Sequence, residues 1–131
     1  MSHGSGQDWH PGGHAWGSLL RAGVVLANGS DNPVLPDFSP LQGMYAAVTR
    51  TTHTGLVLSP EQAISPADAL YSYTAAAAYA ARAEQHIGRI TPGMYADLVV
   101  LSADPCDPKA PPLKDIQVDL TMVGGEVVFV R

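Results

Sequence analysis

Hydrophobic positions follow a helical spacing near the start of the chain and then an extended run. Trp16, Leu19 and Leu20 stand at i, i+3 and i+4, and Gly23 follows them. This pattern predicts a short helix with a glycine at the C′ position. Residues 24–27 are then apolar without interruption. Such a run predicts a strand buried on both faces, as in a parallel sheet.

Three serine-proline pairs mark predicted helix starts in the middle of the chain, at residues 39–40, 59–60 and 65–66. Each pair supplies an N-cap residue followed by a proline that suits the first helical position. The first pair predicts a helix that ends near Arg50. The third predicts helix through the alanine-rich residues 66–85, as one helix or as two consecutive helices.

From residue 88 onward the spacing changes to that of strands. Residues 98–101 form an apolar run that predicts a buried strand, and apolar residues alternate with polar ones over residues 118–122. The glycines at 124–125 predict the two-residue turn of a hairpin whose second arm is residues 126–130. The last third of the chain is therefore predicted to be a small antiparallel β unit.

The strand predicted at residues 24–27 has no predicted partner, because no other strand is predicted before residue 88. Parallel strands need neighbours within a covered sheet to satisfy their backbone groups. We therefore expect that part of a larger sheet is missing from this sequence.

Length and composition limit the class of protein. A chain of 131 residues has the length of one ordinary domain and is too short for a complete (β/α)8 barrel, which needs roughly 200 residues. Hydrophobic residues make up 46% and charged residues 15% of the chain, so it can bury a core. The net charge of −5 and the lack of a Lys/Arg cluster argue against a nucleic-acid-binding surface, which concentrates positive charge.

The sequence also bears on compartment. Cys106 is the one cysteine, so no internal disulfide can form and nothing indicates an oxidising compartment. The first residues lack the charged and apolar regions of a secretory signal, and no run of about 18 apolar residues predicts a membrane span. Residues 1–13 are rich in glycine and proline and predict a flexible arm. We expect a cytoplasmic protein.

Six ordered stretches together carry a resemblance to one enzyme family. They are WGSLLRAG at 16–23, GSDNPV at 29–34, PLQGMYAAVTR at 40–50, ALYSYT at 69–74, GRITPGMYADLVVL at 88–101 and TMVGGEVV at 121–128. In this order they resemble the closing portion of the metal-dependent amidohydrolase superfamily. The most similar part of it is the amidohydrolase-3 group, with its D-aminoacylase-like and N-substituted formamide deformylase-like enzymes.

The resemblance implies a mixed α/β fold in two portions. Residues 14–87 would be the last βα portion of an amidohydrolase (β/α)8 barrel, with its last strand and C-terminal helices. Residues 88–131 would be strands of the small composite β-sandwich domain that stands beside the barrel in this family. The flexible arm of residues 1–13 would precede both portions.

The resemblance also implies a chemistry and one residue that performs it. The family hydrolyses non-peptide C–N bonds in amide-like substrates with a divalent metal, for which we expect zinc. Its GSD aspartate, here Asp31, binds the metal and handles the proton of the attacking water, a role suited to a carboxylate beside a metal-activated water. The residues alone also permit a plain Asx-type turn at Gly29–Pro33.

The other metal ligands of the family have no counterpart in this sequence. The His-x-His of the first strand, the bridging carbamylated lysine (or glutamate or cysteine) of the fourth and the single histidines of the fifth and sixth have no counterpart, whereas zinc takes three or four protein ligands. His3, His10 and His14 are poor substitutes, because Pro11 and the glycines after it prevent the helix that would align the last two. We therefore expect that the chain alone is not catalytically competent.

Two further predictions concern binding. Arg50 is a candidate for binding a substrate carboxylate, although its place at a helix end also suits a capping or salt-bridging role. An alternative to the enzyme hypothesis is a non-catalytic remnant that covers its apolar surfaces by association. The expected partner is a second copy of the chain or the missing N-terminal barrel portion, and neither nucleic acid nor a membrane is expected.

Overall fold

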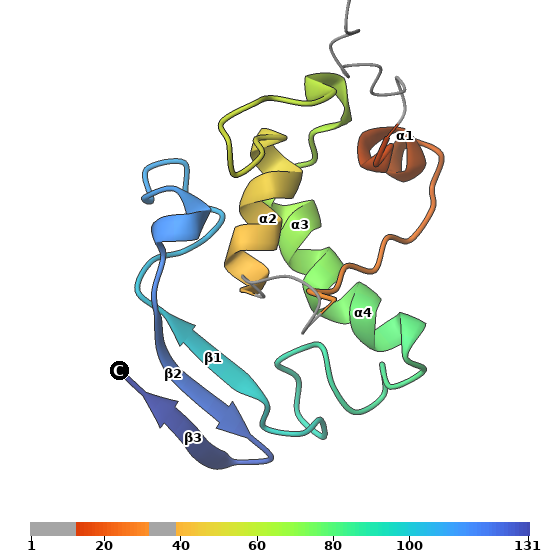
Figure 1. Cartoon of the computed structure of the whole chain (residues 1–131). Helices are drawn as coiled ribbons and strands as arrows, with labels where there is room; N and C mark the ends of the chain where they lie inside the picture. Colours follow the sequence, from red (N-terminus) through yellow and green to blue (C-terminus); the bar gives the residue numbers. More distant parts are fainter. Residues whose placement is uncertain (1–12, 32–38) are drawn as a thin grey trace, which may run out of the picture.

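The chain combines short helices with an antiparallel sheet, as the sequence predicts (Figure 1). The computed structural model describes residues 13–31 and 39–131. Within them the elements are, in chain order, α1 (Trp16–Arg21), α2 (Pro40–Thr49), the 3-10 turn η1 (Pro60–Gln62), α3 (Pro66–Tyr73), α4 (Ala75–Ala80), β1 (Leu98–Leu101), the 3-10 turn η2 (Leu113–Asp115), β2 (Val118–Val123) and β3 (Glu126–Val130). The predicted flexible arm lies outside the described residues except for its last residue.

The helix starts follow the serine-proline pairs. Both α2 and α3 begin at the proline of their pair, and at α3 the Ser65 Oγ accepts a hydrogen bond of 3.0 Å from the Asp68 N–H. The middle pair starts a single 3-10 turn, because Ser59 has a left-handed backbone with φ 46°. The alanine-rich stretch forms two helices that divide at Thr74 and end at Ala80, earlier than the predicted limit of residue 85.

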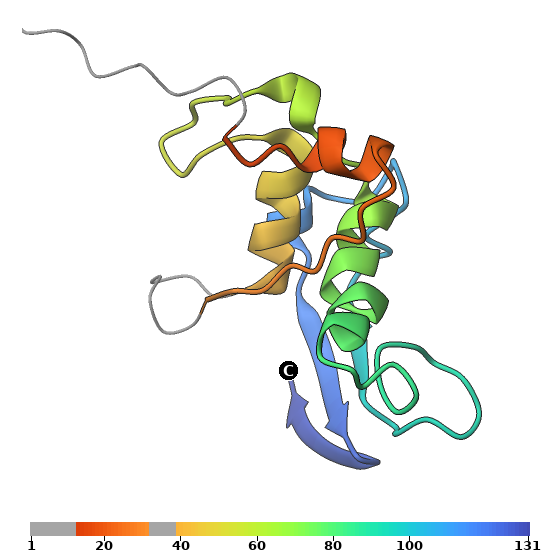
Figure 2. The same cartoon turned by 90° about the vertical axis from the view of Figure 1, so that its right-hand side faces the viewer.

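The core lies between α2 and α3 and continues under η2. Its buried side chains come from the inner faces of these three elements and from the η1–α3 connection: Leu41, Met44, Ala47, Ile64, Ala69, Leu113 and Ile116. Leu101 and Val118, at one end of the sheet, pack against this core. The helical part therefore contacts the sheet at one end, and the rest of the sheet extends away from it (Figure 2).

The sheet has the predicted hairpin. Its strand order within the described residues is β1-β2-β3, with both neighbouring pairs antiparallel. Gly124 and Gly125 take φ values of 57° and 88°, which is the geometry of a two-residue turn that only glycine adopts easily. The carboxylate of Asp97 accepts a hydrogen bond of 2.7 Å from the Gly124 N–H, so the residue before β1 also fixes the hairpin turn.

Two predictions about strands are wrong. Residues 24–27 are not a strand, and Val24 and Val25 are 45% and 50% exposed. The run stays irregular because no described segment offers it the neighbouring parallel strand that it would need. The strand at 98–101 forms as predicted, but Val99 and Val100 are 52% and 50% exposed rather than buried, because the helices contact the sheet only at its end.

The burial of Tyr73 predicts a fold that loses stability at alkaline pH. Its phenol at the end of α3 lies against Gly43 of α2, and burial raises the pKa of Tyr73 above its ordinary value of 10.0. The phenol therefore ionises first in the unfolded chain, so the stability that it contributes is full below about pH 10 and is lost as the pH rises through the folded-state pKa. We expect the urea midpoint to fall from about pH 9 upward, and to fall less in Tyr73→Phe.

Tyr79 provides the matched control for this pH series. Its side chain on α4 is 60% exposed, so Tyr79→Phe should leave the pH dependence of the urea midpoint as it is in the parent chain. An equal pH dependence in the parent chain and in Tyr73→Phe would contradict the assignment to Tyr73.

Candidate functional site

Asp31 ends an irregular segment that is fixed to α3 just before it. The Asn28 N–H donates to the Ser72 carbonyl at 3.0 Å, and the Asn28 Nδ2 donates to the Ser72 Oγ at 2.9 Å. Ser72 is 2% exposed, and its hydroxyl in turn donates to the Ala69 carbonyl at 2.6 Å. The segment is thereby held at Asn28, three residues before Asp31.

The backbone of Asp31 has φ 53°, a left-handed conformation that aspartate tolerates better than most residues. The residue is exposed, so its carboxylate is open to solvent and to a ligand. Residues 32–38, which complete the GSDNPV stretch, lie outside the described residues. The sequence singled out Asp31 but did not identify Asn28 and Ser72, which are 44 residues apart and show no shared pattern.

The described residues do not by themselves fit a metal ion. Residues 13–31 and 39–131 contain no group of three or more His, Cys, Asp or Glu side chains that could hold one, whereas a zinc site takes three or four protein ligands. His14 lies beside Trp16, with ring centroids 5.4 Å apart, and lines a cavity beside Arg50. His3 and His10 lie outside the described residues.

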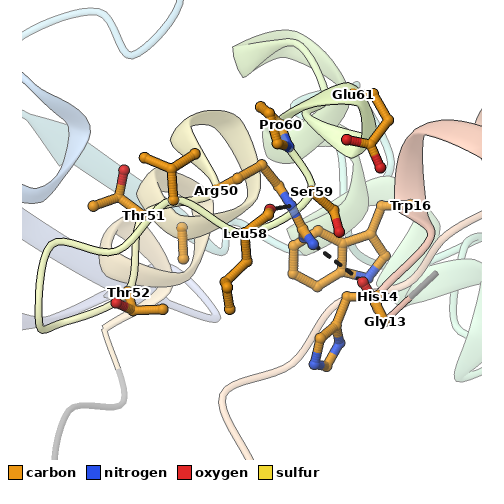
Figure 3. Close-up of a pocket in the computed structure, with 12 residues that line it drawn as sticks. Gly13, His14, Trp16, Arg50, Thr51, Thr52, Leu58, Ser59, Pro60 and Glu61 are labelled. Carbon is orange, nitrogen blue, oxygen red and sulfur yellow. Dashed lines mark hydrogen bonds between the residues drawn. The ribbon is translucent and has the colours of Figure 1, made fainter. Parts of the chain in front are cut away.

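Arg50 joins three segments that are far apart in sequence (Figure 3). It is the C-cap residue of α2, with a left-handed φ of 59°, and it is only 7% exposed. Its Nε donates to the Leu58 carbonyl at 3.0 Å and its Nη2 to the Gly13 carbonyl at 3.2 Å. The guanidinium lies 4.8 Å from the centre of a Trp16 ring, within the range of a cation–π contact.

Arg50 is a buried cation whose loss of water is compensated by neighbouring groups. Burial lowers the pKa of Arg50 from its ordinary value of 12.5, and the charge of Glu61 opposes this effect. The guanidinium stays charged near neutral pH, because arginine remains protonated in proteins. The backbone carbonyls and the aromatic ring therefore replace the water that this cation loses.

A cavity of about 680 Å³ lies beside this arginine. Its walls come from the start of α1, the end of α2 and the loop that follows α2: Gly13, His14, Trp16, Ala46, Arg50, Thr51, Thr52, Val57, Leu58, Ser59, Pro60 and Glu61. Apolar walls with a few polar groups are typical of small-molecule sites. The sequence did not predict the cavity, because it needs three segments to meet.

The structure does not bring Asp31 and Arg50 together. Arg50 is at the C-terminal end of α2, whereas the segment of residues 24–31 runs toward the N-terminal end of that helix in both views (Figures 1 and 2). A helix of 10 residues is about 15 Å long. Arg50 is the C-cap residue of α2, and its guanidinium donates to backbone carbonyls of two other segments. A contact with a substrate carboxylate stays a prediction.

The amino-acid sequence of the chain is similar to that of known proteins over nearly its whole length. A sequence model described as "Amidohydrolase family" matches residues 3–129. An N-substituted formamide deformylase of Arthrobacter pascens is 37% identical over 114 residues, which cover 87% of this chain and 21% of the relative. The putative amidohydrolase YtcJ of Bacillus subtilis is 30% identical over 127 residues, covering 95% of this chain and 24% of the relative.

A solved structure agrees with these sequence relatives. The amidohydrolase of Thermotoga maritima superposes with a TM-score of 0.68 at 27% identity, covering 90% of this chain and 26% of that one. The chain thus spans only about a fifth to a quarter of the length of these relatives. This partial coverage fits the closing portion that the sequence motifs indicate. No helix within the described residues is long and apolar enough to cross a membrane.

Proposed function

The chain belongs to the amidohydrolase family, and from this premise we propose that it is the C-terminal portion of a metal-dependent amidohydrolase. Such an enzyme hydrolyses non-peptide C–N bonds in small amide-like substrates. The observation that carries the proposal is the GSD stretch at residues 29–31, which lies inside the matched region and exposes its aspartate at the end of a segment fixed to α3.

In this proposal the fold divides as the motifs suggest. Residues 14–87 are the last βα portion of the barrel, and residues 88–131 are strands of the small β-sandwich. The irregular run at residues 24–27 would become the last barrel strand once a neighbouring strand pairs with it, since its apolar sequence already suits burial. The half-exposed Val100, on the apolar face of the sheet, would be covered by the second layer of the sandwich.

Asp31 is the residue of this chain proposed to act in the reaction. Its exposed carboxylate would accept the proton of the attacking water and pass it to the leaving nitrogen, which is general acid–base chemistry. A divalent metal, zinc by expectation, supplies the activation of that water in the family. Because the described residues do not complete a metal site, further ligands must come from elsewhere, and the chain alone is proposed to be inactive.

A chimera tests the role of Asp31. This chain would replace the matching segment of the Arthrobacter deformylase, to which it is 37% identical, and formamide hydrolysis would be measured. We expect an active chimera that Asp31→Ala slows by about 10²- to 10⁴-fold. Asp104→Ala removes another exposed aspartate and should leave the rate within about twofold, since surface substitutions are usually mild.

The isolated chain provides the second half of the test. Here we expect no zinc-dependent hydrolysis of amides, with or without Asp31. Zinc-dependent turnover by the isolated chain that is lost in Asp31→Ala would overturn the proposal that it is inactive alone. A chimera that folds and hydrolyses formamides equally well without the Asp31 carboxylate would overturn the catalytic role of this residue.

A second candidate function is self-association, which the exposed sheet favours. One face of the sheet carries only apolar side chains, from all three strands: Leu98, Val100, Leu120, Met122, Val127 and Val130. Val100, Val127 and Val130 are 50%, 51% and 66% exposed. Contiguous apolar surface of this kind is typical of an interaction site, so a chain present on its own is proposed to associate with further copies of itself.

A further inference from the structure

Strand β3 is an open edge of the sheet. It pairs with β2 on one side, and no described segment lies along its other side (Figure 1). All five of its residues are exposed, and four of them are Val127, Val128, Phe129 and Val130. An edge strand leaves a row of backbone N–H and C=O groups free to pair with another strand, and natural edges are usually protected by lysine, proline or cover. Strand β3 contains neither lysine nor proline, and its one irregularity in pairing is at Val128.

An irregularity in the pairing decides which side chains of β3 share a face. Phe129 lies opposite Thr121 and Val127 lies opposite Met122, so Val128 is an extra residue between them. Side chains otherwise alternate along a strand. Val127 and Val130 therefore lie on the same, apolar face, and Glu126, Phe129 and Arg131 lie on the other face. Arg131 follows this pattern, because it forms an ion pair of 2.7 Å with Asp119 of β2.

These faces permit a symmetric register in which a second β3 strand pairs along its whole length. Opposed residues of an antiparallel pair must lie on the same face of the sheet. When Glu126 is opposed to Arg131 of a second copy, Val127 meets Val130, and both of these pairs keep their face. The extra residue Val128 then lies opposite Phe129 at the centre of the pair. A shift by one residue in either direction sets Val127 against Phe129 or Arg131 of the second copy, which lie on opposite faces.

We propose that a second copy of this chain pairs with β3 in this antiparallel register, so that Glu126 of each copy meets Arg131 of the other. This inference rests on the second proposed function and names its surface. Charge complementarity identifies the partner, because the two-fold arrangement places a carboxylate opposite a guanidinium at both ends of the strand pair. Arg131 is 54% exposed despite its ion pair with Asp119, and a guanidinium has donors for two carboxylates.

The contact is small, so it belongs among weak associations. The mass of the isolated chain, measured by sedimentation from about 10 µM to about 1 mM, should change from monomer to dimer. Glu126→Arg sets two arginines against each other, and Arg131→Glu sets two glutamates against each other. Each variant should dimerise about tenfold more weakly than the parent chain.

An equimolar mixture of the two variants is the decisive measurement. The mixed pair restores an arginine opposite a glutamate at both ends, so heterodimers should form with about the affinity of the parent dimer. Mixing each variant with the parent chain gives only one restored pair and should give intermediate affinity. Thermal unfolding of each variant alone verifies that it is folded.

Val100→Arg separates pairing at the edge from stacking of the apolar faces. Val100 is on β1, away from the β3 edge, and is half exposed, so this variant should fold and still dimerise. Loss of dimers in Val100→Arg, with no response to the charge exchange, would place the association on the apolar face and overturn the β3 register. A chain that stays monomeric up to about 1 mM would overturn self-association as well, without bearing on the proposed role of Asp31.

Discussion

Replacing Arg50 with alanine is expected to destabilise the fold by about 3 kcal/mol. The substitution removes two hydrogen bonds from a cation, to the carbonyls of Leu58 and Gly13, and the contact with Trp16. Each bond to a charged group is worth roughly 1.5–3 kcal/mol, and both carbonyls lose a partner in a half-buried place. Urea unfolding followed by tryptophan fluorescence, to which Trp16 contributes, measures the effect.

Arg50→Gly is the matched variant, because Arg50 has a left-handed φ of 59°. Glycine loses the same side-chain contacts but adopts this φ without the penalty of roughly 1–2 kcal/mol that other residues incur. The glycine variant should therefore be more stable than the alanine variant by about 1 kcal/mol. If both variants unfold at the midpoint of the parent chain, Arg50 does not brace the fold, and its role would have to be sought in the adjacent cavity.

The helix starts and the hairpin turn could be predicted from sequence because their causes are local. A serine before a proline satisfies an N-terminal backbone group and fixes the first φ of the helix, and α2 and α3 indeed begin at Pro40 and Pro66. Two glycines supply the positive φ values of a tight turn. These signals act within four residues, so they do not depend on what the rest of the chain does.

The strand predicted at residues 24–27 fails for the opposite reason. Its apolar residues suit burial in a parallel sheet, but a strand exists only through hydrogen bonds to a neighbour. In this chain Asn28 is bonded to Ser72 of α3 instead. The pattern therefore describes the environment that the segment needs, and the structure shows that this environment is absent from the described residues.

The residues of the candidate site likewise differ in whether a local signal in the sequence could identify them. Asp31 could be found from a short motif, because the GSD stretch is contiguous. The cavity beside Arg50 could not, because Trp16, Arg50 and Leu58 meet only after α1, α2 and the following loop have packed together. Sequence alone also left two roles open for Arg50. Its two bonds to backbone carbonyls and its low exposure favour a structural role at the end of α2 over contact with a substrate.

Gly88 connects the helical part to the strands, and Gly88→Ala is expected to destabilise the fold by about 3 kcal/mol. Its φ is 92°, and a Cβ there would lie 2.7 Å from the Cβ of Ala78 and 3.1 Å from the backbone of Thr74 and Ala75. Thr74 is the N-cap residue of α4, and Ala75 and Ala78 lie within this helix, so these atoms cannot move aside cheaply. The substitution therefore adds overpacking to backbone strain.

Gly93 allows the two effects to be separated. Its φ is 95°, almost that of Gly88, but a Cβ there has no atom within 4 Å. Gly93→Ala should therefore cost only the backbone strain, about 1–2 kcal/mol, and urea unfolding of both variants gives the packing contribution by difference. Equal losses would mean that the contact with α4 relaxes freely. A larger loss of stability at Gly88 would show that the segment after α4 packs tightly against that helix. This packing then sets the point at which the chain passes from the helical part to the strands.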